Sequence, residues 1–353
     1  MALDAVTTAT NPRLSWPDAR LHIVTGKGGT GKTTVAAALA LALSTDGRRV
    51  LIAEVEGRQG ISQALDVPPL AVEERLLLRV PGGGEVWGIS VDVKAALLEY
   101  LQRFYHLGRA GKTLERLGAI DFATTIAPGV RDVLAIGKVY DTARRTQVAP
   151  SGRRQRDRAE SGVPPTFDYD AVVLDAPPTG RVLRFLNVNS EVANLARVGP
   201  IRHQANSVTE LLKSRATLVH VVTLLEEMPV QEAADTITGL RATGLRVGAV
   251  VVNQAREPRL GPEDMRAALD GQLDITALSE DLARLGLPHD ESTVAGLTAQ
   301  AQEHSERIAL EDDQLAAVDA MGQPVLVLPA LAEGADADAV RRLAHCLTEQ
   351  AEW

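Results

Sequence analysis

The stretch that decides the fold is Gly26-Lys27-Gly28-Gly29-Thr30-Gly31-Lys32-Thr33-Thr34, which follows the apolar run 21–25 and precedes the Ala- and Leu-rich segment 35–43. Between a strand and a helix, this glycine spacing followed by Lys-Thr is typical of a loop whose backbone N–H groups surround a polyphosphate. The first turn of the following helix adds partial positive charge there. The sequence therefore predicts a nucleoside triphosphate site, with Lys32 at the β- and γ-phosphates and Thr33 on Mg²⁺.

A dinucleotide-binding loop is the alternative interpretation of the same glycines. Gly26, Gly28 and Gly31 fit the spacing G-x-G-x-x-G, and Glu54 ends the next strand, where an acid that binds a ribose would lie. That fingerprint does not need a Lys-Thr pair after its last glycine, whereas a triphosphate loop does. The pair therefore favours a triphosphate.

The composition describes a globular chain with an uneven charge. Its 353 residues can bury a large core, and because only 3% of them are aromatic, we expect a core of Ala, Val and Leu. The net charge is −9, yet residues 257–319 alone hold fifteen Asp or Glu against four Arg, a balance of −11. The only compact basic run is 153–158, so we expect no nucleic-acid partner.

Cysteine usage and hydropathy exclude further classes of protein. The single cysteine, Cys346, excludes a disulfide framework and a multi-thiol metal site within one chain. No apolar run reaches the roughly 18–20 residues that a membrane span needs, and the first residues do not resemble a secretory signal. We therefore expect a cytoplasmic protein with no integral membrane segment.

Short apolar runs separated by helical stretches organise the chain. The runs are 21–25, 49–54, 86–91, 171–175, 217–223, 247–253 and 325–329. Continuous apolar runs of this length indicate strands that are buried on both faces of a parallel sheet. The sequence therefore predicts an α/β fold with a doubly wound, mostly parallel sheet of about seven or eight strands and with helical insertions. Ligands are expected at the carboxyl ends of the strands.

The same pass along the chain predicts one domain with several appended segments. We expect a flexible N-terminal tail over 1–19 and a single P-loop domain over 20–353. Within that domain we expect a helical insertion at 92–148, a disordered loop at 151–165 and an acidic helical segment at 257–320, broken near Gly286-Leu287-Pro288. A solvated helical face explains the acidic excess better than a dedicated partner surface does.

A second strand end supplies the acid that a triphosphate site requires. Asp175 ends the run 171–175, and the segment 176–180 that follows predicts a turn near the γ-phosphate, as in a switch loop. A strand-end Asp can instead cap the next helix. With a P-loop in the same chain, a role for Asp175 in the Mg²⁺ shell is favoured.

Lys27 and the segment after Asp175 carry a family resemblance. A lysine at the second P-loop position resembles the deviant Walker A class, which includes the Min/Par ATPases, the nitrogenase iron protein and the arsenical-pump ATPases. The string D-A-P-P-T-G-R-V-L-R at 175–184 resembles the D-T-A-P-T-G-H-T-L-R motif of the arsenical-pump and tail-anchored-protein-targeting ATPases. Further matches are 92–100, Pro128-Gly129, 251–254 and 327–329. The single-domain actinobacterial members, the anion-transporting ATPases, also carry a segment similar to E-V-E-G-R-Q-G at 54–60.

The resemblance implies roles around the phosphates. Thr34 would contact the α-phosphate, and Lys27 would cross a dimer interface to the nucleotide of the other subunit. A cation delivered in this way is worth roughly 10³–10⁵ in rate in comparable enzymes. Glu56 is the best match to the acid that positions the attacking water, and Glu54 is the second choice.

The resemblance also implies the rest of the nucleotide site. Asn253 would read the adenine edge, and Pro329 would flank the adenine ring. ATP and Mg²⁺ are the implied cofactors.

Departures from the family narrow the expected function. Arsenite binding needs clustered thiolates and a bridging iron–sulfur cluster needs two cysteines per subunit, and neither is possible with one cysteine. The leading hypothesis is a Mg-dependent ATPase that binds ATP at the interface of a homodimer, or of a heterodimer with a homologous subunit. Hydrolysis would drive opening and closing that acts on an unidentified protein client. The alternatives are a chaperone or targeting factor for hydrophobic segments, an anion or metalloid pump subunit, a surface-organising ATPase and a metabolic ligase.

Overall fold

The computed structural model of the protein describes residues 14–16, 18–92, 95–96, 128–146, 167–195, 200–331 and 336–352. Most of the expected tail 1–19, much of the expected insertion 92–148 and the whole of the expected loop 151–165 lie outside these residues.

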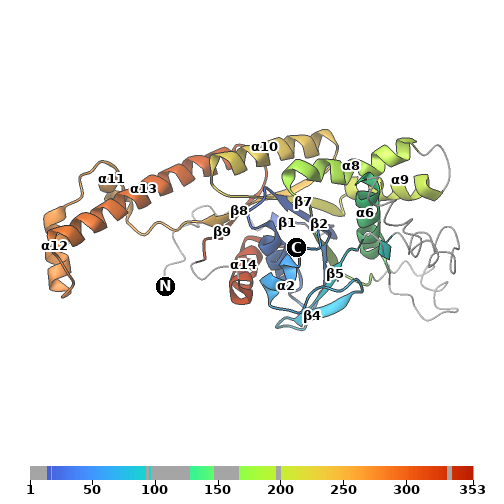
Figure 1. Cartoon of the computed structure of the whole chain (residues 1–353), viewed down its shortest axis with the longest axis horizontal. Helices are drawn as coiled ribbons and strands as arrows, with labels where there is room; N and C mark the ends of the chain where they lie inside the picture. Colours follow the sequence, from blue (N-terminus) through green and yellow to red (C-terminus); the bar gives the residue numbers. More distant parts are fainter. Residues whose placement is uncertain are drawn as a thin grey trace.

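An eight-stranded sheet forms the centre of the molecule (Figure 1). In spatial order its strands are β4 (Arg75–Arg79), β5 (Glu85–Ser90), β3 (Arg49–Glu54), β6 (Ala171–Asp175), β2 (Leu21–Gly26), β7 (Thr217–Thr223), β8 (Val247–Ala255) and β9 (Val325–Pro329). Every neighbouring pair is parallel except β4 and β5. The predicted α/β fold with a mostly parallel sheet is confirmed.

The sequence did not predict strand β4. Its three leucines are flanked by Arg75 and Arg79, and none of its residues is fully buried. The hairpin to β5 turns through two glycines with positive φ, Gly82 at 91° and Gly83 at 88°. An antiparallel edge strand can leave one face exposed to solvent. Its residues are therefore less buried than those of the central strands, and its sequence is harder to recognise.

Helices cover both faces of the sheet. One face packs against α1 (Lys32–Leu43), α2 (Gly60–Leu65) and α14 (Ala337–Gln350). The other packs against α6 (Pro128–Arg144), α8 (Thr179–Leu195), α9 (Pro200–Lys213) and α10 (Glu227–Ala242). Every residue from Val35 to Leu43 in α1 is buried, because this helix lies between the sheet and α14. Its small alanines allow that close packing, as the low aromatic content led us to expect.

The described part of the N-terminal segment pairs with the end of the chain. Strand β1 (Leu14–Ser15) lies parallel to β10 (Ala351–Glu352), and the ring of Trp16 contacts that of His220 edge-on at 5.8 Å between centroids. None of the helices in the described residues is long and apolar enough to cross a lipid bilayer.

Three helices, which we call the arm, project from one end of the sheet: α11 (Pro262–Leu269), α12 (Ile275–Arg284) and α13 (Glu291–Asp319) (Figure 1). The break between α12 and α13 falls where Gly286-Leu287-Pro288 predicted it. The Asp290 carboxylate caps α13 by accepting from the N–H of Thr293 at 3.0 Å. At 29 residues, α13 is roughly 40 Å long.

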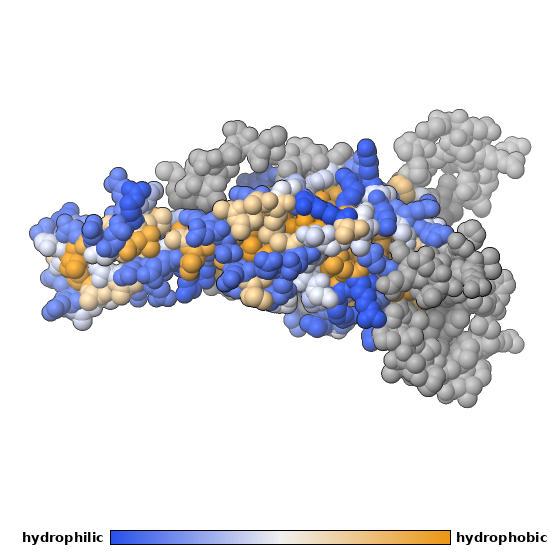
Figure 2. Space-filling view, turned by 90° about the horizontal axis from the view of Figure 1, so that it is seen from above, coloured by the Kyte–Doolittle hydropathy of each residue, from blue (hydrophilic) through white to orange (hydrophobic). Residues whose placement is uncertain are grey.

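The arm is anchored at its base and exposed along its length. Buried Glu311 accepts hydrogen bonds from the backbone N–H and guanidinium of Arg256, which follows β8 directly. No residue of α12 is buried. Figure 2 shows hydrophilic and hydrophobic residues interspersed along the upper surface of the arm.

Two histidines are buried on adjacent strands. His22 on β2 and His220 on β7 stack at 5.4 Å between ring centroids, with His22 Nδ1 3.1 Å from His220 Nε2. Burial lowers the pKa of His22 to about 3 and that of His220 well below its ordinary value. Below about pH 6.5 the two histidines bind protons in the unfolded chain but stay neutral in the native state. The free energy of unfolding therefore falls as the pH falls toward 3.

Replacing His22 and His220 together by Asn is expected to flatten this dependence. Between pH 6.5 and pH 5 the variant should lose about 3 kcal/mol less unfolding free energy than the unmodified protein, because two histidines no longer take up protons on unfolding. Urea denaturation at a series of pH values measures the slope. Parallel slopes for the two proteins would show that the pair does not titrate on unfolding.

Candidate nucleotide site

The loop between β2 and α1 contains two positions that only glycine can occupy. A Cβ on Gly26 would lie 2.5 Å from the carbonyl oxygen of Val222 on β7. Gly31 has a φ of 80°, and a Cβ there would lie 2.4 Å from Nδ2 of Asn253. At these two positions the loop passes too close to β7 and β8 for any larger residue.

The N-terminus of α1 is open to an anion. Gly31 is the N-cap and provides no side-chain cap, and the first turn holds no acidic residue. The N–H groups of that first turn have no acceptor within the helix. Gly28 and Gly29 are exposed, and a Cβ on either would meet nothing within 4 Å. The loop thus presents uncompensated N–H groups beside open space, which is the arrangement that binds phosphate.

Side chains hold the backbone of the loop in place. The Thr30 hydroxyl donates to the carbonyl of Lys27 at 2.9 Å, and the Asn253 side-chain amide donates to the carbonyl of Thr30 at 2.9 Å. The β8 strand carries a register shift between Val252 and Ala255, with Gln254 at a φ of 57°. Such a bulge redirects side chains next to functional sites, and here it accompanies the contact of Asn253 with the loop.

Asp175 meets the first two residues of α1. Its carboxylate accepts a hydrogen bond from the Thr33 hydroxyl at 2.8 Å and lies 3.4 Å from Nζ of Lys32. Burial raises the pKa of Asp175, and the charge of Lys32 and the hydrogen bond from Thr33 oppose that rise. The predicted phosphate lysine, hydroxyl and strand-end acid therefore form one cluster.

Glu54 lies on the neighbouring strand beside Asp175. The two residues are in register between β3 and β6. Glu54 is 2% exposed; its Oε1 accepts from the N–H of Gly60 at 3.1 Å, and its Oε2 is buried with no hydrogen-bond partner among the described residues. Burial raises the pKa of Glu54, and the negative charge of Asp175 adds to the rise.

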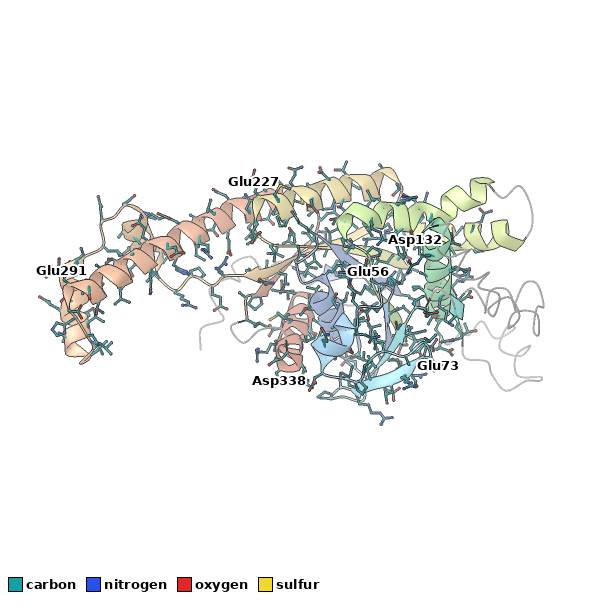
Figure 3. The ribbon with its side chains drawn as sticks, viewed as in Figure 1. Glu56, Glu73, Asp132, Glu227, Glu291 and Asp338 are labelled. Carbon is teal, nitrogen blue, oxygen red and sulfur yellow. The ribbon has the colours of Figure 1, made fainter. Side chains whose placement is uncertain are left out.

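Glu56 lies in the segment just after β3. In Figure 3 it lies near the carboxyl ends of the central strands, on the side that faces α6 and its labelled residue Asp132. Its Oε1 is 3.5 Å from Nη1 of Arg181 at the start of α8, and its Oε2 is 3.6 Å from Nε of Arg58. The second guanidinium nitrogen of Arg181 lies 3.8 Å from the carboxylate of Asp132 on α6. Glu56 is thus connected to two helices outside the loop.

The side chain of Lys27 contacts α10 and not the loop that carries it. Its Nζ is 3.0 Å from Oε1 of Glu232 on α10, and Oε2 of the same carboxylate accepts from the hydroxyl of Thr179 at 2.9 Å. The hydrogen bonds from Lys27 and Thr179 hold the pKa of Glu232 below its ordinary value. One carboxylate therefore joins the P-loop, α10 and the first residue of α8.

The donor atoms suit magnesium and a triphosphate. The hydroxyl of Thr33 and the carboxylates of Asp175 and Glu54 are hard oxygen donors, and Glu54 Oε2 is a buried acceptor without a partner among the described residues. No group of three or more His, Cys, Asp or Glu that could form a metal cage occurs in the described residues. Mg²⁺ typically binds through one or two side chains, several waters and substrate phosphates, so this sparse set fits it.

The structure brings together most, but not all, of the predicted residues. Those from Gly28 to Thr34 line the loop, and Asp175 and Asn253 contact it. Pro329 ends β9, where it pairs with Ala255 of β8, one strand further from the loop than Asn253.

Two contacts of the site escaped sequence reasoning. Arg181 was present in the quoted 175–184 string, and its departure from the family histidine was a signal that could have drawn attention to it. Glu232 lies on a helix without a motif, and nothing in its local sequence marks it.

Comparisons with known proteins agree with the fold and the loop. The family model described as "Anion-transporting ATPase" matches residues 19–216. ATPase BagA of Mycobacterium tuberculosis is 42% identical over 98% of both chains. The arsenical pump-driving ATPase of Escherichia coli is 26% identical over 75% of this chain and 45% of that protein. ATPase get3 of Schizosaccharomyces japonicus is 25% identical over 52% of this chain and 51% of that protein.

The family model covers more than half of the chain and includes the loop, β6 and the start of α8. The relative from M. tuberculosis extends the similarity over almost the whole length. The chain therefore belongs to the ArsA family of anion-transporting ATPases, and its enzymatic activity is ATP hydrolysis.

Proposed function

We propose that the protein is a Mg²⁺-dependent ATPase that binds ATP between two protomers and converts hydrolysis into opening and closing that acts on a protein partner. The observation that carries the proposal is the position of Lys27. Its ammonium is held by Glu232 on α10, outside the cradle formed by residues 28–34. A P-loop lysine whose ammonium lies outside its own cradle can reach a nucleotide bound by a second protomer once it leaves Glu232.

Each residue of the site has a defined task in this proposal. The N–H groups of the loop bind the phosphates, and Lys32 neutralises the β- and γ-phosphates. Thr33 and Asp175 would hold the Mg²⁺ that offsets the charge on the phosphate oxygens. Glu56 orients the attacking water through its carboxylate, and Glu54, which lies deeper and accepts from Gly60, supports the metal shell.

Asn253 and Pro329 are proposed to hold the adenine. Asn253 contacts the carbonyl of Thr30 in the structure, so it has to exchange or share that hydrogen bond when it reads the base. Pro329 would lie against one face of the ring from the neighbouring strand. Both residues lie at the carboxyl ends of strands, where ligands bind in open parallel sheets.

The second protomer is a copy of the chain or a homologous subunit. Lys27 must leave Glu232 before it can reach the nucleotide of the other protomer, and the carboxylate that accepts from Thr179 then loses its cationic partner. Because Thr179 begins α8, the exchange connects nucleotide binding at the interface to a helix on the outside of the sheet. This connection is the proposed route from hydrolysis to movement.

The protein partner is proposed to contact the arm. Much of the expected helical insertion 92–148 lies outside the described residues. Among the described residues, most of the large apolar side chains that are exposed belong to the arm or to the turn between α12 and α13: Leu269, Ile275, Leu285, Leu287, Leu297 and Leu310. Exposed apolar side chains are common when scattered, so they support a contact surface only together with the arm's projection from the body.

Glu232→Gln is expected to ease dimer formation. The neutral amide weakens the contact that holds Lys27 within its own chain, while Thr179 keeps a hydrogen-bond acceptor. Exposed ion pairs contribute about 0.2–1 kcal/mol, so the nucleotide concentration that supports half-maximal association should fall by up to about fivefold. Analytical ultracentrifugation against an ATP analogue measures it.

Glu227→Gln on the same helix is the matched control. Glu227 is exposed and forms no ion pair with another described residue. Its substitution should leave association unchanged. An equal shift in both variants would mean that the overall charge of α10, rather than the release of Lys27, controls assembly.

A further inference from the structure

The carboxylate of Glu56 is the inner member of a charged cluster. Its side chain is 14% exposed, whereas those of its cationic neighbours Arg58 and Arg181 are 75% and 63% exposed. Oε2 of Glu56 is buried and has no hydrogen-bond partner among the described residues, although Arg58 lies within ion-pair distance. The acid is thus enclosed, with Oε1 at hydrogen-bond distance from Arg181 and Oε2 shielded from solvent beside Arg58.

Arg58 and Arg181 differ in what they can fix. Arg58 lies two residues after Glu56 on the same irregular segment, where Gly57 has a φ of 64°, so it moves with the acid. Arg181 lies in the first turn of α8, which packs against the sheet and α6. Only Arg181 can therefore hold the Glu56 carboxylate in a fixed place relative to the body of the domain.

The Arg181 guanidinium contacts two acids with two different nitrogens. Nη1 faces Glu56 at 3.5 Å, and Nη2 faces Asp132 on α6 at 3.8 Å. The guanidinium group is planar, with its donors in a fixed fork. A displacement of Asp132 therefore rotates the Arg181 guanidinium and changes its hydrogen bond to Glu56.

We propose that Arg181 is a positioning residue for Glu56 and that it makes the orientation of this carboxylate depend on α6. The inference rests on the proposed role of Glu56 in orienting the attacking water. A glutamate has one more rotatable bond than an aspartate, and without an anchor its carboxylate samples several positions. Anchoring one oxygen restricts the positions that the other can take when it accepts a hydrogen bond from the attacking water.

The test compares Arg181→Gln with Arg184→Gln, one turn further along α8. Arg184 is exposed and has no ion pair with Glu56 among the described contacts, although its charge also acts on Asp132. The control therefore removes a charge near Asp132 from the same helix without removing a contact to Glu56. General-base catalysis contributes about 10²–10⁴. We expect kcat to fall about 10- to 100-fold in Arg181→Gln, with KM within twofold and with nucleotide-dependent thermal protection retained. Arg184→Gln should behave as the unmodified protein.

A second arm separates positioning from a structural role. In a Glu56→Gln background, Arg181→Gln should cause no further loss, since the anchor then has no carboxylate to hold. Arg181→Lys should recover part of kcat because it keeps a charge but loses the fork. Asp132→Asn should lower kcat less than Arg181→Gln does. Equal kcat values for Arg181→Gln and Arg184→Gln, or an undiminished loss in the Glu56→Gln background, would overturn the inference.

The outcomes distinguish this inference from the proposed function. If Lys32→Ala is inactive while Glu56→Gln keeps full turnover, the ATP site stands and the inference falls. If Lys32→Ala hydrolyses ATP normally, the proposed function fails first. A melting temperature within a few degrees of the unmodified protein shows that Arg181→Gln remains folded, as expected for an exposed side chain.

Discussion

Lys32→Ala is expected to abolish the protection against thermal unfolding that nucleotide gives. Lys32 is the cation nearest to Asp175 in the loop, at 3.4 Å, and its side chain is 13% exposed. Without it the β- and γ-phosphates lose their principal counter-charge at the loop, while Asp175 remains close by as an uncompensated acid. Ligand at one hundred times its Kd stabilises a protein by about 2.7 kcal/mol, so losing the site removes a shift that differential scanning fluorimetry resolves easily.

The nucleotide-free variant is the internal reference for this experiment. Removing Lys32 also removes a charge that opposes the rise in the pKa of Asp175, so the variant's own melting temperature has to be measured without nucleotide. The prediction concerns only the additional shift on adding ATP and Mg²⁺. A shift equal to that of the unmodified protein would remove the assignment of the loop as the phosphate site.

Lys27→Ala is expected to separate binding from turnover. Lys27 contacts Glu232 in its own chain at 3.0 Å, so its loss should leave the cradle of residues 28–34 able to bind ATP. Turnover should fall by roughly 10³-fold or more, since cations supplied in trans contribute about 10³–10⁵. ATP-dependent association should weaken in parallel.

Steady-state kinetics, nucleotide-dependent thermal shift and sedimentation velocity together check this prediction. Lys27→Arg is a useful comparison, because it keeps the charge and tests whether a point charge of that length is required. Normal turnover in Lys27→Ala would contradict the role in trans, and a loss of nucleotide binding would assign Lys27 to its own cradle instead.

The sheet was predictable because its central strands are buried on both faces. The run 171–175 is apolar up to its final Asp175, and every residue of 217–223 is buried. A strand that packs against helices on both faces needs apolar residues on both faces, and its sequence therefore reveals it. Sequence analysis missed the edge strand β4 (Arg75–Arg79), because its three leucines are only partly buried and an exposed arginine stands at each end.

The loop of the site was also predictable, because its chemistry is local. Residues 26–34 carry the turn, the cation and the hydroxyl within one segment. The side chains that contact this loop come from distant segments of the chain, so most of these contacts depend on the tertiary structure. The ion pair of Lys27 with Glu232 joins residues 205 positions apart and requires β2 and β7 to be neighbours.

Asn253 and Arg181 show two further limits of sequence analysis. The sequence predicted that Asn253 lies at the end of a strand. It did not predict the bulge in β8 that accompanies the contact of Asn253 with the Thr30 carbonyl. Arg181 stood in a recognised motif, but its value depends on Glu56 and Asp132 meeting it from two other elements. In both cases the side chain's role follows from the contact and not from the residue type.

The most direct test of the central claim is a crystal structure with Mg²⁺ and a non-hydrolysable ATP analogue. The account predicts the triphosphate against the N–H groups of residues 28–34, with Lys32 on the β- and γ-phosphates. It also predicts Lys27 of the partner subunit at the γ-phosphate and released from Glu232. A loop without the analogue, or a bound analogue with Lys27 still on Glu232 in a catalytically competent protein, would contradict it.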